Sequence, residues 1–221
     1  MKKPVVDYRQ FRLSKLNNPE FSHLKLLFGW VVYFSFYFLT ENIIPVENCH
    51  VIYCGLDSII PFNEWFIIPY TFWYLLIVIS LIYFALYNTE SFKKLQTYII
   101  ITQIISVIIY IVYPSCQNLR PVVFPRDNFL TDCISLIYSL DTNTGVCPSL
   151  HCAYSIGIAS VWFREKSVSK LWKAFVTITV ILICLSTMFI KQHSAVDFFA
   201  ALPVCLVAEI LVFKVFFKKV G

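Results

Sequence analysis

Long apolar segments, separated by short polar ones, run along most of this chain. A helix that crosses the hydrocarbon core of a bilayer needs about 20 mostly apolar residues. Segment 65–87 contains no charged residue, whereas 24–44 includes Glu41 and 148–163 is short. The pattern predicts an all-α integral membrane protein, built as a six-transmembrane-helix bundle with spans at 24–44, 65–87, 95–113, 148–163, 171–190 and 196–217.

The composition of the chain supports the membrane interpretation. Of its 221 residues, 58% are hydrophobic and only 14% are charged, against about 25% charged in an average soluble domain. So little polar surface excludes a water-soluble globule. The net charge of +5 does not indicate nucleic-acid binding, because the basic residues are spread between the spans and form no patch or recognised motif.

The positions of Lys and Arg predict the orientation in the membrane. Basic residues are enriched in the cytoplasmic loops of membrane proteins. All but three of the 18 Lys and Arg residues lie in the N-terminal arm, around the second-to-third and fourth-to-fifth connections, or in the C-terminal tail. The exceptions are Arg120, Arg126 and Lys191. We therefore expect both termini in the cytoplasm, and the compactness of the chain favours a bacterial plasma membrane.

Residues 1–23 form a basic arm before the first span. Its length, its acidic residues Asp7 and Glu20, and the lack of a small-residue cleavage site argue against a signal peptide. An interfacial helix and a solvated tail beside an anionic leaflet are about equally compatible with it. Residues 24–221 are expected to form one membrane domain.

Five of the eight cysteines fall in predicted outer segments, where disulfides are permitted. Cys49 with Cys54, and Cys116 with Cys133 or Cys147, are possible pairs. Sequence alone does not set the connectivity.

Residues suited to phosphate chemistry lie at the span boundaries, and the first group starts the fourth span at 148–151. Pro148 fits the first turn of a helix, and the N–H groups of a helix N-terminus bind anions. Ser149 would add a hydroxyl donor, and His151 would protonate a leaving oxygen. Taken alone, this pattern is more often an ordinary helix start with an interfacial histidine.

His193 and Asp197 are four residues apart and share one face of a helix. A carboxylate at this spacing can fix the tautomer of the ring and leave its other nitrogen free, and histidine is an established nucleophile in group transfer. A structural His–Asp pair is one alternative, and a metal site with His151 is another. We rank the metal site lower because carboxylates are scarce here, and we expect neither a metal nor a cofactor.

Three cations on the outer side are candidates for binding phosphate. Ionisable groups near a bilayer are costly and are functional candidates by default, and Arg binds phosphate through two parallel hydrogen bonds. The candidates are Arg120, Arg126 and Lys191. A solvated loop charge is the alternative for each, and for Arg126 it is nearly as good because Asp127 adjoins it.

Three motifs, in this order along the chain, resemble those of the type-2 phosphatidic acid phosphatase superfamily of membrane lipid phosphatases: Arg120-Pro121, Pro148 through His151, and Ser186 followed by His193 and Asp197. The resemblance covers the chain from about the third span to the sixth. It implies that His193 attacks phosphorus, that Asp197 supports it, and that His151 protonates the leaving group.

Two positions depart from the superfamily pattern. Tyr113 stands where the superfamily has Lys, and Thr187 stands where it has Arg. Lys191 and Arg126 are our candidates for replacing these cations. The Pro-Ser-Leu-His and Lys-Gln-His variants resemble the branch that includes inositol-phosphoceramide-synthase-like phosphotransferases.

We therefore expect a lipid phosphate phosphatase with its active site at the outer face, hydrolysing a phosphomonoester or diphosphate head group through a phosphohistidine intermediate. A lipid head-group phosphotransferase, in which an alcohol replaces water, is the first alternative. A non-catalytic membrane or transport protein is the second. The expected partners are the lipid bilayer and a lipid phosphate substrate, whose identity the sequence does not set.

Overall fold

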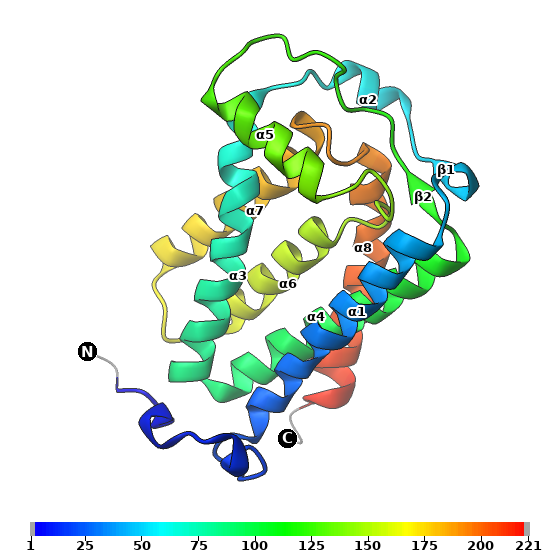
Figure 1. Cartoon of the computed structure of the whole chain (residues 1–221). Helices are drawn as coiled ribbons and strands as arrows, with labels where there is room; N and C mark the ends of the chain where they lie inside the picture. The colour runs from blue at the N-terminus through cyan, green and yellow to red at the C-terminus, as the bar shows by residue number, and fades with distance from the viewer. Residues whose placement is uncertain (1–2, 219–221) are drawn as a thin grey trace.

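The computed structural model describes residues 3–218, which form a bundle of helices (Figure 1). Within these residues, five helical segments are long and apolar enough to cross a membrane: Ser22–Ile43, Glu64–Tyr87, Thr89–Val112, Lys170–Phe189 and Ala195–Phe216. They agree closely with five of the six predicted spans, except that the third begins at Thr89 rather than at residue 95. The chain is thus suited to a lipid bilayer.

These segments are built from five α-helices and three short helical extensions. Side chains of Asn88, Ser169 and Ser194 cap three of the helices by accepting hydrogen bonds from backbone N–H groups, as residues of these types commonly do. The bounds are α1 (Phe28–Ile43) after η3 (Ser22–Leu27), α3 (Ile67–Tyr87) after η5 (Glu64–Phe66), α4 (Thr89–Val112), α7 (Lys170–Phe189), and α8 (Ala195–Ile210) continued by the π-helical η6 (Leu211–Phe216).

The helix α6 (Leu150–Arg164) lies at the centre of the bundle, in contact with α3, α4, α7 and α8. Gly157 permits this position, because a Cβ there would lie 2.4 Å from the ring of Tyr98 on α4. With 15 residues, α6 is about 22 Å long. It falls in the predicted fourth span but is shorter than a full crossing, so the sixth span stays a prediction.

The remaining elements gather at one end of the bundle, while the two ends of the described chain lie at the other (Figure 1). Two short strands pair in parallel, with His50 opposite Ser115. The sequence did not predict the 12-residue α5, which begins at the Asn128 cap. The elements at this end are η4 (Val46–Asn48), β1 (His50–Val51), α2 (Gly55–Ile59), β2 (Ser115–Cys116) and α5 (Phe129–Leu140). All eight cysteines are free thiols, so none of the possible disulfide pairs is formed.

The N-terminal arm is folded against the opposite end of the bundle. It contains two short 3₁₀ helices, η1 (Tyr8–Gln10) and η2 (Leu13–Lys15). Val6 and Phe21 are buried, and the Tyr8 hydroxyl donates to the Ala85 carbonyl at 3.0 Å. The arm is therefore neither a single interfacial helix nor a free tail.

Helix α1 is packed less tightly than the other helices. None of its residues is buried, and it contacts mainly α4 and η3. Helix α6 is the opposite case, because most of its residues are buried. The space beside the loosely packed α1 is where the candidate site lies.

Candidate functional site

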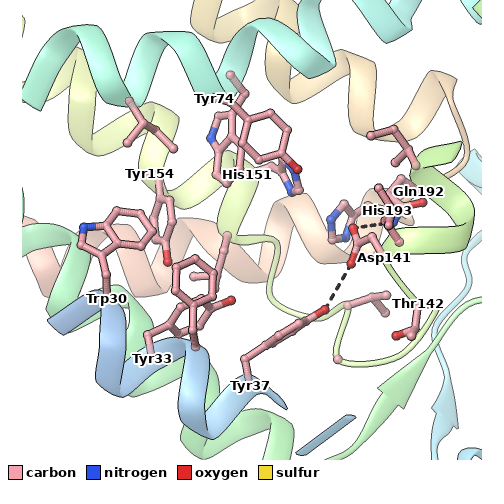
Figure 2. A pocket seen from close by; sticks show the side chains of 18 of the residues that line it. Trp30, Tyr33, Tyr37, Tyr74, Asp141, Thr142, His151, Tyr154, Gln192 and His193 are labelled. Carbon is pink, nitrogen blue, oxygen red and sulfur yellow. Dashed lines mark hydrogen bonds between the residues drawn. The ribbon is translucent and has the colours of Figure 1, made fainter. Parts of the chain in front are cut away.

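A cavity of about 540 Å³ lies between α1, α3, α6 and the loop that follows α5 (Figure 2). Figure 2 shows Trp30 and Tyr154 at one end, and Asp141, Gln192 and His193 at the other. The lining is mostly aromatic and aliphatic, with Phe34, Trp73, Ile77, Val78, Leu81, Ile137, Leu140 and Val146 among its residues, and its polar side chains gather near Asp141, Gln192 and His193. A cavity with one apolar and one polar end matches a molecule with a hydrocarbon tail and a polar head.

His193 lies in the turn between α7 and α8. Its backbone N–H donates to the Thr187 carbonyl at 2.9 Å. Lys191 has a φ of 57°, in the left-handed region that costs a non-glycine residue about 1–2 kcal/mol. This tight turn brings the His193 ring to the polar end of the cavity, directly before the Ser194 cap of α8.

The His193 ring is paired with the Asp197 carboxylate. The distance from Nδ1 of His193 to Oδ2 of Asp197 is 3.1 Å, and the same oxygen accepts from the Ser194 N–H at 3.0 Å. Burial by itself lowers the pKa of His193, but the hydrogen bond and charge of Asp197 outweigh it, so the pKa is raised. Since Nδ1 is engaged, Nε2 is the nitrogen left for chemistry.

His151 is held mainly by aromatic rings. Its ring centroid lies 4.6 Å from that of Tyr70 and 4.1 Å from that of Trp73. The side chain is 9% exposed, and its Nε2 has no hydrogen-bond partner within residues 3–218. The centroids of His151 and His193 are 5.6 Å apart. Both rings line the cavity, so the structure brings together the two histidines that the sequence singled out.

The start of α6 adds backbone donors to this end of the cavity. The first N–H groups of a helix have no carbonyl of their own helix to bind and attract anions. Leu150 and His151 supply two of them and line the cavity. Ser149 is fully buried, and its Oγ accepts from the Cys152 N–H at 3.4 Å. Ser149 therefore acts as the helix cap behind the cavity lining.

Arg120 lies one layer behind the cavity, on the far side of Gln192. Its guanidinium donates to Gln192 Oε1 at 3.0 Å and to the backbone carbonyls of Tyr138, Asp141 and Thr142. Burial lowers the pKa of Arg120, and the charge of Asp141 opposes this effect. The guanidinium fastens the loop after α5, so its position gives no support to direct phosphate binding.

The other two predicted cations lie away from the histidines. The Lys191 ammonium donates to the carbonyls of Asp57, at 2.8 Å, and Ile60. Burial lowers the pKa of Lys191, and the charge of Asp57 opposes this effect. Arg126 pairs with Glu64, with 2.7 Å between Nε and Oε1. Neither residue lines the cavity, so the structure does not bring these cations to the site.

Asp57 is a site residue that the sequence did not reveal. It is 4% exposed, and its carboxylate accepts from the Ser194 hydroxyl at 2.6 Å and from the Ala195 N–H at 2.8 Å. Asp57 thus holds the start of α8 from the side of α2, directly beside His193. Because 137 positions separate Asp57 from Ser194, no local pattern could have linked them.

Asp141 is the second residue that sequence analysis missed. Its Oδ2 accepts from Gln192 Nε2 at 2.7 Å, and its Oδ1 accepts from the Tyr37 hydroxyl at 3.2 Å (Figure 2). The carboxylate lines the cavity. The one available signal is its position directly after an apolar segment, which does not point to a site.

The metal-site alternative finds no matching geometry in residues 3–218, which contain no group of three or more His, Cys, Asp or Glu side chains placed to hold a metal ion. Comparison with protein families, with curated proteins and with solved structures gives no match to this chain. The resemblance to the lipid phosphatase superfamily therefore rests on the sequence motifs alone.

Proposed function

We propose that this chain is a membrane enzyme that removes a phosphate group from a lipid through a phosphohistidine intermediate. One observation carries the proposal: the His193–Asp197 pair meets His151 at the polar end of a cavity whose other end is apolar. A nucleophile beside a supporting carboxylate, with a second proton carrier nearby, is the arrangement that covalent group transfer requires.

In the first half-reaction, Nε2 of His193 attacks phosphorus and forms a P–N bond. The P–O bond to the lipid alkoxide breaks, and His151 gives that oxygen a proton, which releases a lipid alcohol. Asp197 stabilises the positive charge that develops on the His193 ring.

In the second half-reaction, His151 takes a proton from water, whose oxygen attacks phosphorus. The P–N bond breaks, which frees phosphate and restores His193. The N–H groups at the start of α6 face the negative oxygens of the phosphoryl group in both steps.

The membrane placement follows from the same proposal. In it, α6 completes six passes, both termini are cytoplasmic, and the histidines face the outer side. The lipid enters sideways between α1 and α3, with its tail along the apolar end of the cavity. Support comes from the distribution of Lys and Arg and from the position of the two ends of the described chain at one end of the bundle (Figure 1).

Thiol labelling tests this placement. Val122 and Lys166 are exposed at opposite ends of the bundle, and each is replaced by cysteine in a background without native cysteines. On intact cells, an impermeant thiol reagent should label the first position and not the second. The reverse pattern would place the histidines on the cytoplasmic side.

Head-group transfer to an alcohol is the second candidate function. It is favoured by Asp141, because a carboxylate in the lining suits a phosphodiester with one negative charge better than a phosphomonoester with two. Both candidates begin with attack of His193 on phosphorus and release of a lipid alcohol, and they differ in the donor lipid and in the acceptor.

A lipid panel on purified protein tests the proposed chemistry. Phosphate release from a lipid phosphate indicates hydrolysis, and head-group exchange onto an added alcohol indicates transfer. Either should produce an acid-labile phosphoprotein that is absent from His193→Ala. A folded protein that turns over no lipid and forms no phosphoprotein would contradict both, and would favour a non-catalytic or transport function.

A further inference from the structure

We infer that the polar end of the cavity recognises a positively charged amine on the lipid head group. The donor lipid would then be a zwitterionic phosphodiester, with an amine, a phosphate and a hydrocarbon tail in that order. This inference rests on the first half-reaction of the proposed function and names the class of donor lipid that its second candidate, head-group transfer, would use.

The first observation is the placement of Asp141. Its carboxylate lines the cavity and is held from two sides by Tyr37 and Gln192. An ionised carboxylate has about four acceptor sites, so these two bonds leave acceptor capacity toward the cavity. The Asp141 carboxylate is fixed in position but can still accept further hydrogen bonds.

The second observation is the charge of the lining. Among the described residues that line the cavity, Asp141 is the only Asp, Glu, Lys or Arg. Arg120, which lies behind Gln192, donates to carbonyls and to the Gln192 side chain rather than into the cavity. The Asp141 carboxylate therefore favours a cation beside it, whereas the N–H groups at the start of α6 favour an anion next to the histidines.

The third observation is the aromatic surround. Tyr33 and Tyr37 come from α1 and stack with ring centroids 5.8 Å apart, and Tyr74 comes from α3. Figure 2 shows Tyr37 and Tyr74 on opposite walls of the cavity. Aromatic faces attract alkylammonium groups, most strongly where water is excluded. A carboxylate beside aromatic rings is chemistry suited to an amine.

The order of the lining groups matches the order of groups in such a lipid. Asp141 and Gln192 lie at one end, His193 and His151 follow, and Trp30 lies at the other end (Figure 2). With its amine at Asp141, the lipid would place its phosphate between the histidines and its tail along the aromatic end.

The first half-reaction then leaves the amine on the enzyme. As the P–N bond to His193 forms, the P–O bond to the lipid alkoxide breaks, and the proton from His151 yields a neutral lipid alcohol. The phosphoryl group on His193 still carries the amine-bearing group through its one remaining ester bond. Water or an alcohol then attacks phosphorus and gives its proton to His151, and the P–N bond breaks.

Turnover in vesicles gives the first test. Purified protein is given phosphatidylcholine, phosphatidylethanolamine, phosphatidylglycerol or phosphatidate, and release of the lipid alcohol is measured. The amine lipids should be preferred. Asp141→Asn, which removes the charge with little change in shape, should lower kcat/KM for amine lipids about 10- to 100-fold, as loss of a close charge pair does, and should largely remove the preference.

Glu41→Gln is the matched control. The Glu41 carboxylate accepts hydrogen bonds from the side chains of Thr142 and Thr144, which line the cavity. Glu41 itself does not line it. Its loss of charge should leave the preference for amine lipids unchanged. An equal loss in both variants would show that the effect of Asp141 is one of general charge, and would overturn the inference.

Binding separates this inference from the proposed function. Quenching of tryptophan fluorescence reports the affinity for an alkylphosphocholine, an alkyl phosphate and an alkylphosphoglycerol, without any turnover. The wild-type protein should bind the alkylphosphocholine most tightly, and Asp141→Asn should remove that difference. Equal or tighter binding of the alkyl phosphate overturns the inference, and tightest binding of the alkylphosphoglycerol replaces the amine with a polyol. If the amine is preferred but no lipid is turned over, the proposed function fails and the recognition stands.

Discussion

The two histidines of the cavity are held by different kinds of contact. Nδ1 of His193 is 3.1 Å from the Asp197 carboxylate, whereas His151 stacks between Tyr70 and Trp73 and its Nε2 has no partner in the described residues. Both side chains are nearly buried, so exposure does not distinguish them. A nucleophile needs one nitrogen fixed and aimed, which a carboxylate achieves. A group that gives and then takes a proton needs a fixed ring with a nitrogen left free, which stacking achieves.

The largest expected effect comes from removing the ring of His193, which is paired with Asp197. His193→Ala should lower turnover by about 10⁴-fold or more, as loss of a covalent nucleophile does, and should abolish the acid-labile phosphoprotein. Turnover and phosphoprotein are measured with the lipid that the panel selects.

His151→Ala is the comparison variant for that experiment. It should lose about 10²- to 10⁴-fold in turnover of a natural lipid, the usual contribution of general acid–base catalysis. It should recover part of the loss on a phosphate ester with an acidic leaving group, which departs without a proton. If His193→Ala recovered in the same way, the two roles would have to be exchanged.

The second prediction concerns the carboxylate that orients His193. Asp197→Asn should lower turnover by about 10⁴-fold, as in other histidine–carboxylate pairs where the tautomer is lost. Attack requires neutral His193, which forms above its pKa, and Asp197 raises that pKa. Without the carboxylate charge the effect of burial remains, so the acidic limb of the pH–rate profile should move to lower pH. If the acidic limb stayed in place, Asp197 would not be the group that raises the pKa of His193.

The third prediction concerns Arg120, the cation that lies behind Gln192. Arg120→Ala leaves the carbonyls of Tyr138, Asp141 and Thr142 without their donor. A fully buried polar group left unpaired costs about 1–3 kcal/mol, and these carbonyls are only partly buried or exposed, so the unfolding temperature should fall modestly and turnover should fall with the loosened loop. Thermal unfolding and vanadate titration are measured together. A large rise in the vanadate Kd with unchanged stability would show instead that the guanidinium binds phosphate.

The smallest effect is expected from removing a ring that packs against His151. Trp73→Leu removes one of the two rings that hold His151, and aromatic pairs contribute about 0.5–1.5 kcal/mol beyond their burial. Turnover should therefore fall by roughly threefold to tenfold. Trp65→Leu is the control, because Trp65 is 63% exposed and should have no effect. A loss as large as that of His151→Ala would mean that stacking does more than orient the ring.

The helices and the histidine pair could be predicted because their signals are local. A long run of apolar residues indicates a membrane-spanning helix without information from other segments, so the five long helices lie close to their predicted positions. The spacing of His193 and Asp197 likewise needs only one turn of chain to bring the groups together. Helix α5 escaped prediction because it is short and follows a polar loop.

The partners of the cations could not be predicted, because they depend on contacts between distant segments. Lys191 meets carbonyls that lie more than 130 positions away in the chain, and Arg120 meets carbonyls whose positions depend on where α5 ends. Gln192 bridges Arg120 and Asp141 only after α7, α5 and the loops at this end of the bundle have packed. A charge beside a motif is thus a weak guide to what that charge binds.

Asp197 links both histidine-bearing segments. Its side chain holds His193, and its main-chain carbonyl accepts from the Ser149 N–H, at 3.1 Å, where α6 begins. The Asp197 carbonyl thus ties the start of α6 to the turn that carries His193, while Tyr70 and Trp73 hold the His151 ring from α3. In the proposed reaction, these contacts would keep the two rings aligned, while the loosely packed α1 would accommodate lipid tails of different length and branching.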